Sequence, residues 1–255
     1  MRLSALFLTL IALASPALAY GGLGEVELYD RTARQTLPMY QRQGRLYVAG
    51  EPQHQYEVRI RNRSGGRLLA VTSVDGVNVV TGETAAERQS GYVIDPAGET
   101  VIDGWRKSLD EVATFYFTSL GDSYAARTGR ARDVGVIGVA LFREREAPCC
   151  KHLEERRDQA AGASPPTTQS APSVAGEGAG ARREAQSKLG TGHGQREASA
   201  ARYVDFERRS NTPDQTIVIY YDSRQNLIAQ GIIPSRPALA DRRPNPFPNG
   251  FVPDP

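Results

Sequence analysis

The stretch YEVRIR at residues 56–61 decides the fold class of this chain. Tyr56, Val58 and Ile60 alternate there with charged residues. Successive side chains of a β-strand point to opposite faces, so the pattern predicts one buried face and one solvated face. Long amphipathic helical patterns are missing from the sequence, which favours an all-β fold over an α/β fold.

Outward from this stretch, turn signals separate further short apolar or alternating runs. Asp75-Gly76 predicts a tight hairpin turn, because both residue types tolerate positive φ. Residues 134–142 (VGVIGVALF) are apolar on both faces and predict a central strand. Residues 24–146 are therefore expected to form an antiparallel sandwich or jelly-roll-like domain. The other expected strands are 25–29, 45–49, 68–74, 77–80, 92–94, 100–102 and 114–118.

A second set of strands is expected in residues 189–233. Residues 216–221 and 227–232 flank the polar loop 222–226 as a hairpin, and residues 203–207 offer a third strand. An isolated hairpin is marginally stable in water. The hypothesis is that these strands dock on the first domain and complete its sheet.

Low-complexity segments surround these strands. Residues 147–188 contain a charged ramp and a stretch, 160–181, in which Ala, Gly, Ser, Pro and Thr are 19 of 22 residues. This composition predicts a disordered linker. Residues 234–255 are proline-rich and predict an extended tail, with Phe247 and Phe251 as its aromatic anchors.

Residues 1–19 have the pattern of a signal peptide. Arg2 precedes an apolar run, and Ala17-Leu18-Ala19 forms a small-x-small cleavage site. The apolar run is shorter than the roughly 20 residues of a membrane-spanning helix. The mature protein is therefore expected to be periplasmic or secreted, with no transmembrane segment after cleavage.

Charge and cysteine content exclude several functions. The net charge of +2 gives no reason to expect nucleic acid as a partner. The two cysteines, Cys149 and Cys150, are adjacent, so no disulfide can join distant segments of one chain. They are expected as two thiols, a strained vicinal bridge or bridges to another chain.

Signals for metal or cofactor chemistry are weak. His54, His152 and His193 lie far apart, and the spacing in Cys149-Cys150-Lys151-His152 does not match a zinc site. The glycine-rich residues 190–194 lack the strand and helix context of a phosphate loop, and a flexible entry to the C-terminal strands is expected there. No cofactor, metal site or catalytic residue is therefore predicted.

Two groups of residues remain as candidates for a site. Trp105, followed by Arg106 and Lys107, would contact a sugar or an acidic partner, or else Trp105 would fill one end of the core. A carboxylate pair such as Asp75 and Asp103 would allow acid/base hydrolysis, although turn carboxylates are more often structural. The carboxylates expected at strand ends are Asp75, Glu83, Asp95, Asp103, Asp110 and Glu111.

Residues 61–85, 91–108 and 123–144, together with the shorter stretches 25–30, 189–194, 206–208 and 221–224, resemble a family of exported, uncharacterised proteobacterial proteins. The resemblance implies a Gram-negative envelope setting and a β-rich fold. It carries no assigned activity, cofactor or catalytic residue.

Together these features predict an exported, non-enzymatic envelope protein that acts as a structural or interaction module, with an envelope protein or a glycan as its unknown partner. The first alternative is a lectin-like, carbohydrate-binding domain that uses Trp105. The second alternative is a hydrolase that uses the loop carboxylates.

Overall fold

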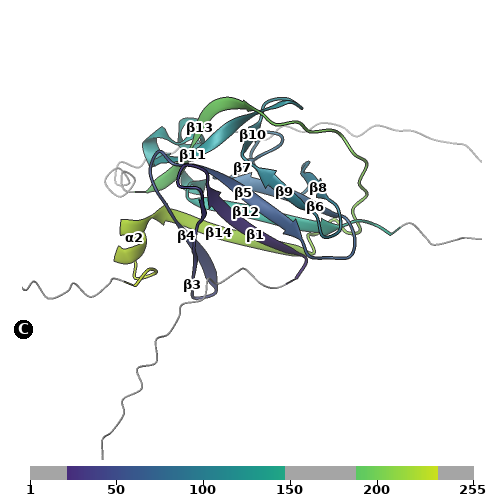
Figure 1. Ribbon diagram of the computed structural model, residues 1–255, viewed down its shortest axis with the longest axis horizontal. Helices are drawn as coiled ribbons and strands as arrows, with labels where there is room; N and C mark the ends of the chain where they lie inside the picture. Colours follow the sequence, from purple (N-terminus) through teal and green to yellow (C-terminus); the bar gives the residue numbers. More distant parts are fainter. Residues whose placement is uncertain (1–21, 147–187, 235–255) are drawn as a thin grey trace, which may run out of the picture.

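Two seven-stranded β-sheets form the body of the chain that the computed structural model describes, residues 22–146 and 188–234. They pack as an all-β sandwich (Figure 1), so the predicted fold class is confirmed. The expected leader, the cysteine pair, residues 147–187 of the expected linker with its charged ramp, and all but the first residue of the proline-rich tail lie outside the described residues.

The first sheet, called sheet A, has the order β10-β11-β5-β1-β2, with β13 also paired to β11 and β9 paired to β5. All of its recorded strand pairs are antiparallel. Its strands are β1 (Gly24–Asp30), β2 (Gln35–Thr36), β5 (Gln55–Asn62), β9 (Glu99–Ile102), β10 (Gly104–Arg106), β11 (Glu111–Ser119) and β13 (Leu189–Ala198).

The second sheet, called sheet B, has the order β3-β4-β14-β12-β6-β7, with β8 also paired to β6. Its one parallel pair is β14 with β4. Its strands are β3 (Met39–Arg42), β4 (Arg45–Gly50), β6 (Leu68–Val74), β7 (Val77–Asn78), β8 (Tyr92–Ile94), β12 (Val136–Arg143) and β14 (Gln215–Ser223).

The core lies between the two sheets and follows the alternation seen in the sequence. Tyr56, Val58 and Ile60 of β5 are each 0% exposed. On the opposite face of β5, Arg59 forms an ion pair with Glu57. Period-two patterning therefore determined which side chains of this strand enter the core.

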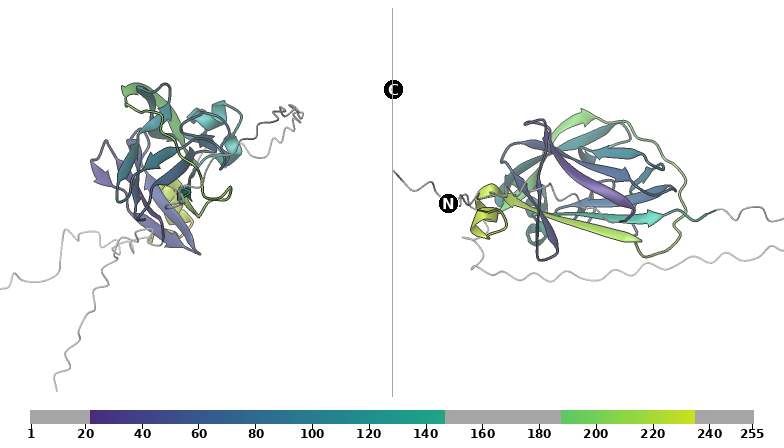
Figure 2. Two further views of the ribbon diagram at one scale, coloured as in Figure 1. Left: turned by 90° about the vertical axis from the view of Figure 1, so that its right-hand side faces the viewer. Right: turned by 60° about the horizontal axis from the view of Figure 1, so that its bottom comes forward.

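The C-terminal segment belongs to both sheets. β13 pairs with β11 along almost its whole length, and β14 lies inside sheet B between β12 and β4. Figure 2 shows β14 running along the sandwich and ending at the short helix α2 (Arg224–Ala229). The arrangement is the docking that the sequence suggested, except that β14 is an interior strand rather than part of a hairpin on an edge.

The predicted hairpin over residues 216–232 is wrong in its second half. Ser223 caps α2 by accepting a hydrogen bond from the backbone N–H of Asn226, so the chain turns into a helix there. Leu227 of this helix is 1% exposed. The third predicted strand, 203–207, is also absent, and the chain there is irregular.

Residues 190–194 form part of β13 rather than a flexible entry. Gly192 lies against the ring of Tyr116, and a Cβ atom at this position would come within 2.1 Å of that ring. The glycine is therefore needed for close packing and not for flexibility.

The remaining elements are short. They are the 3-10 helices η1 (Leu120–Asp122) and η2 (Ala131–Asp133) and the helix α1 (Tyr124–Arg127). Among the helices of the described ranges, none has the length and apolar character needed to cross a membrane.

We expect a chain ending at Glu146 to lose cooperative folding, because β12 and β4 then lack the strand with which both pair. Thermal unfolding followed by circular dichroism measures this. Residues 188–234, supplied as a separate chain, should restore a cooperative transition. A truncated chain with an unchanged midpoint would contradict this interpretation.

Candidate functional site

The most distinctive polar group of the described chain is the carboxylate of Asp75, which lies in the turn between β6 and β7. Asp75 and Gly76 have φ values of 52° and 71°, as a primed hairpin turn requires. The backbone N–H of Asp75 donates to the carbonyl of Val136 at 2.9 Å. This turn directs a side chain that is 0% exposed into the protein.

Three donors hold the Asp75 carboxylate. The Tyr221 hydroxyl donates to Oδ1 at 2.5 Å, and the backbone N–H groups of Gly135 and Thr191 donate to Oδ1 and Oδ2 at 2.9 and 2.8 Å. The Thr191 hydroxyl lies 2.7 Å from that of Tyr221 and 2.6 Å from that of Tyr56. Because Tyr221 donates to the carboxylate, it can accept from Thr191, which in turn can accept from Tyr56.

This network of Asp75, Tyr221, Thr191 and Tyr56, here called the buried network, joins the two sheets. Tyr56 and Thr191 belong to sheet A, whereas Tyr221 and Asp75 belong to sheet B or its turn. Tyr221 is 3% exposed, and its ring lies 5.5 Å from that of Phe117 and 6.5 Å from that of Tyr56, measured between ring centroids. The side chains of β13 and β14 thus meet those of the N-terminal strands inside the core.

Burial controls the ionisation of the network. It raises the pKa of Asp75 to about 6, even though the Tyr221 hydroxyl and the backbone N–H groups favour the charged form. Burial and the nearby carboxylate raise the pKa of Tyr221 and of Tyr56 well above 10. At neutral pH the carboxylate is therefore charged and held by neutral donors.

The suggested pairing of Asp75 with Asp103 for hydrolysis is corrected by this geometry. Asp75 has no surface that a substrate could reach, and its oxygens already accept three hydrogen bonds. Asp103 lies between β9 and β10, where burial raises its pKa and Arg31 opposes that rise. The pair cannot act as two accessible carboxylates.

The other carboxylates named from the sequence occupy separate positions. Glu83 accepts from the Gln89 side chain at 3.2 Å, and Glu111 accepts from Arg196 at 3.4 Å. The Asp95 carbonyl closes a turn by accepting from the N–H of Gly98. The Asp110 carbonyl accepts from the backbone of Ser199.

Trp105 lies in the core, 2% exposed, so its indole offers no exposed stacking surface. Its indole meets Phe115 edge-on with 4.8 Å between ring centroids, and Tyr124 at 5.0 Å. His193 stacks on it at 6.3 Å. The indole N–H has no partner among the described residues. Of the two interpretations that the sequence left open, the structure supports Trp105 as a core residue.

Arg106 and Lys107 do not act together with Trp105. The Arg106 guanidinium donates to the Tyr92 hydroxyl at 2.9 Å and to the carbonyl of Ser199 at 2.7 Å. Lys107 helps to lower the pKa of His193, although burial of the imidazole is the larger cause. The three residues do not form one contact surface.

The histidines do not converge. His54 directly precedes β5, and its Nδ1 lies 2.8 Å from the Asp30 carboxylate. His193 lies elsewhere, stacked on Trp105. His152 lies outside the described residues. Within residues 22–146 and 188–234, no group of three or more His, Cys, Asp or Glu side chains is placed to hold a metal ion.

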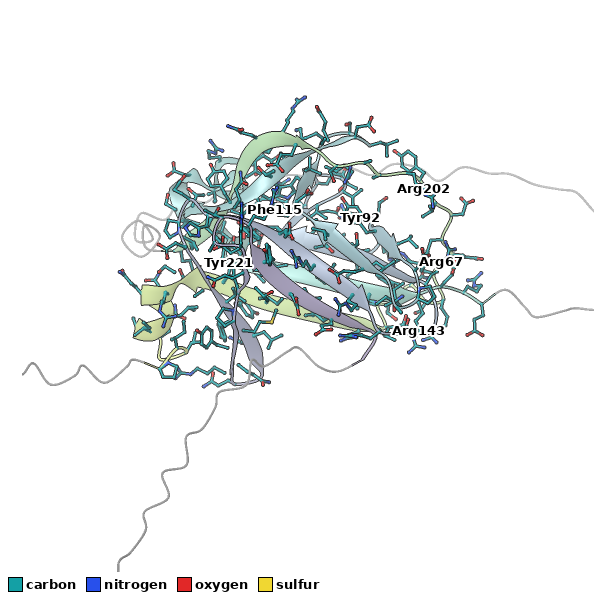
Figure 3. All side chains as sticks on the ribbon, viewed as in Figure 1. Arg67, Tyr92, Phe115, Arg143, Arg202 and Tyr221 are labelled. Carbon is teal, nitrogen blue, oxygen red and sulfur yellow. The ribbon has the colours of Figure 1, made fainter. Side chains whose placement is uncertain are left out.

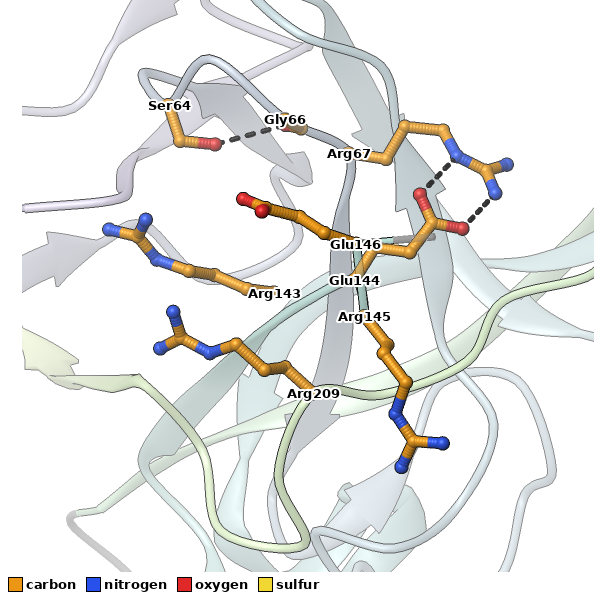
Figure 4. A pocket seen from close by; sticks show the side chains of 8 residues that line it. All are labelled: Ser64, Gly66, Arg67, Arg143, Glu144, Arg145, Glu146 and Arg209. Atoms are coloured by element: carbon orange, nitrogen blue, oxygen red, sulfur yellow. Dashed lines mark hydrogen bonds and ion pairs between the residues drawn. The ribbon is translucent and has the colours of Figure 1, made fainter. Parts of the chain in front are cut away.

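A surface hollow of about 320 Å³ lies where β12 ends, and four arginines contribute to its lining. Figure 4 shows the side chains of Arg143, Arg209 and Glu146 among those that line the hollow. The hollow is lined by Ser64, Gly66, Arg67, Arg143, Glu144, Arg145, Glu146 and Arg209. We call it the arginine hollow.

Acidic residues compensate most of this charge. Arg67 pairs with Glu144, Arg145 with Glu207, and Arg209 with Asp214. The Asp214 carboxylate also accepts from the backbone N–H of Arg143 at 2.9 Å.

The Arg143 guanidinium differs from the other three. It has no hydrogen bond or ion pair with the residues that the structure describes, so all of its donors remain available for an anionic group.

Sequence reasoning missed both the buried network and the arginine hollow. Asp75 and Tyr221 are 146 positions apart, and Arg67 and Glu144 are 77 positions apart. Single residues of common types carried no signal that they would meet.

Comparison of the chain with models of protein families, with curated proteins and with solved structures found no match.

Replacement of Asp75 by Asn should flatten the pH dependence of stability. Since the folded-state pKa of about 6 exceeds the ordinary value of 3.8, the folded protein binds more protons, and the free energy of unfolding falls as pH rises from about 4 to 6. This difference between the two pKa values corresponds to a loss of about 3 kcal/mol in the free energy of unfolding. Urea unfolding of both proteins between pH 4 and pH 7.5 measures it. A parallel pH profile in D75N would contradict this assignment.

Replacement of Tyr221 by Phe should destabilise the protein by about 1–3 kcal/mol at pH 7, because a buried carboxylate loses a donor. The measurement is the urea midpoint. Tyr220→Phe is the matched control, since the hydroxyl of this neighbouring, half-buried tyrosine has no hydrogen bond within the described ranges. Equal effects of the two variants would argue against a special role for Tyr221.

Proposed function

We propose that this protein is an exported, non-enzymatic component of the Gram-negative envelope, periplasmic or secreted, that acts as a structural or interaction module. The signal-peptide pattern of residues 1–19 and the resemblance to exported proteobacterial proteins support the location. The sandwich supports the structural or interaction role, because hydrogen bonds between side chains join its two sheets in addition to apolar packing.

The arginine hollow is the observation that carries the interaction role. Arg143 and Arg209 both line this exposed hollow, and the Arg143 guanidinium has no hydrogen bond or ion pair with the described residues. The planar guanidinium group suits bidentate contact with carboxylate or phosphate. A partner that carries such anionic groups, whether an envelope protein or a glycan, fits this surface.

The two alternatives receive less support. A lectin-like site built on Trp105 would need an exposed indole face, and this indole is packed against Phe115 and His193. A hydrolase that used Asp75 would need an accessible carboxylate, and this one ties the sheets together. Both residues have structural roles that account for them.

Binding to envelope material tests the proposal. The purified protein should co-sediment with outer-membrane vesicles or peptidoglycan, and the double variant R143Q/R209Q should lower the bound fraction about fivefold, because charge-assisted hydrogen bonds to the anion are lost. Added salt should weaken the binding of the wild-type protein.

The control is R34Q/R88Q, which removes two exposed arginines that lie outside the hollow. An equal loss in both double variants would indicate nonspecific attraction. Unchanged binding of R143Q/R209Q would remove the hollow from the proposal.

A further inference from the structure

An irregular segment, residues 199–207, leaves the end of β13 in sheet A and reaches the end of β12 in sheet B. We call it the strap. In Figure 1 it forms the green arc at the edge of the sandwich, and Figure 3 places Arg202 on this arc. It belongs neither to the buried network nor to the arginine hollow.

The body holds the strap at its first end. Arg106 donates to the carbonyl and the hydroxyl of Ser199 at 2.7 and 3.1 Å. The backbone N–H groups of Ser199 and Ala201 donate to the carbonyls of Asp110 and Leu109 at 2.7 and 2.6 Å. This end is therefore fixed by both side-chain and backbone contacts.

The second end is also fixed. Arg67 donates to the carbonyl of Asp205 at 3.1 Å, and the N–H of Arg145 donates to the carbonyl of Glu207 at 2.7 Å. Phe206 packs on an apolar cluster on the outer face of sheet B. This cluster consists of Leu69, Val71, Ala140 and Phe142, with Val93 beside it.

The middle of the strap is free. Residues 202–204 make no hydrogen bond with any other part of the chain that the structure describes. Tyr203 is 89% exposed and Val204 is 44% exposed, and both are among the most exposed large apolar residues of the described ranges. Their backbone N–H and C=O groups are available for pairing with another chain.

We propose that the strap is a preorganised peptide ligand for the substrate cleft of an endopeptidase, with the backbone of residues 202–204 paired in the cleft and Tyr203 in an apolar primary pocket. The inference rests on the proposed function as an interaction module and names one of its surfaces. A convex segment needs a concave partner.

Two physical reasons favour this class of partner. A peptide cleft forms main-chain hydrogen bonds with an extended segment and reads one or a few side chains in pockets, which matches free backbone groups around one protruding aromatic residue. A segment fixed at both ends also loses less conformational entropy on binding than a free peptide.

Binding to α-chymotrypsin, which has a hydrophobic primary pocket, tests the inference. An active-site alanine variant of that enzyme serves as the probe, and surface plasmon resonance measures binding of the purified full-length protein. Y203A should bind at least about tenfold more weakly, as expected when a central aromatic anchor is removed.

Y203F should retain binding, since the pocket takes the ring. V101A, which trims an exposed apolar residue on β9, is the matched control and should leave binding unchanged. No binding by the wild-type protein, or equal binding by Y203A, would overturn the inference.

Active chymotrypsin provides a second test, of preorganisation. The wild-type protein should inhibit cleavage of a chromogenic peptide. The peptide bond that follows Tyr203 should be cleaved more slowly in the protein than in a free peptide of residues 198–208. R106Q, which releases Ser199, should be cut faster than the wild-type protein. Cleavage of the wild-type strap at the rate of the free peptide would overturn the inference.

Failure here and failure of the proposed function are distinguishable. The peptidase experiments depend on Tyr203 and Arg106, whereas the envelope experiment depends on Arg143 and Arg209.

Discussion

The Asp75 carboxylate and the hydroxyl groups that lead to it are the constraint on which the sandwich depends. A buried carboxylate without donors would cost several kcal/mol, so the surrounding strands must be placed to supply them. Tyr221 and the Thr191 backbone do so from two strands of the C-terminal segment. The Asp75 carboxylate therefore obtains these hydrogen bonds only when β13 and β14 are correctly placed.

The same constraint explains why the surface, rather than the interior, carries the proposed interactions. The polar side chains of the buried network bond to one another, and Trp105 packs with its aromatic neighbours in the core. What remains for a partner lies where irregular segments cross the ends of the strands. The arginine hollow and the strap are both of this kind, and Arg67 contributes to each of them.

The N-terminal strands could be predicted from the sequence because their signal is local. β5, β6 and β8 lie where alternation and turn residues indicated, and the Asp75-Gly76 turn has the predicted positive φ values. β13 could not be predicted in this way. Its glycines have no apolar pattern, and they fit a strand only because Tyr116 of the neighbouring strand lies against Gly192.

The candidate site was less predictable than the fold. The helix α2 was also not predicted, because its local pattern fits a strand as well as a helix. Leu227 satisfied the pattern of a strand equally well, and the cap formed by Ser223 decided for a helix. Asp75 was correctly placed in a turn, but its burial could not be foreseen from a residue type that is usually exposed there. Trp105 was open between core and surface, and packing against Phe115 and Tyr124 decided for the core.

The sequence by itself determined the all-β class, the main strands and the hairpin turn, because period-two burial and positive φ are properties of neighbouring residues. Only the tertiary structure decided which carboxylate is buried, which arginines line a hollow and which tyrosine is exposed. The partners of Asp75 lie 116 and 146 positions away along the chain. Hydrogen-bond partners at such separations are chosen by strand order and register, which no local pattern specifies.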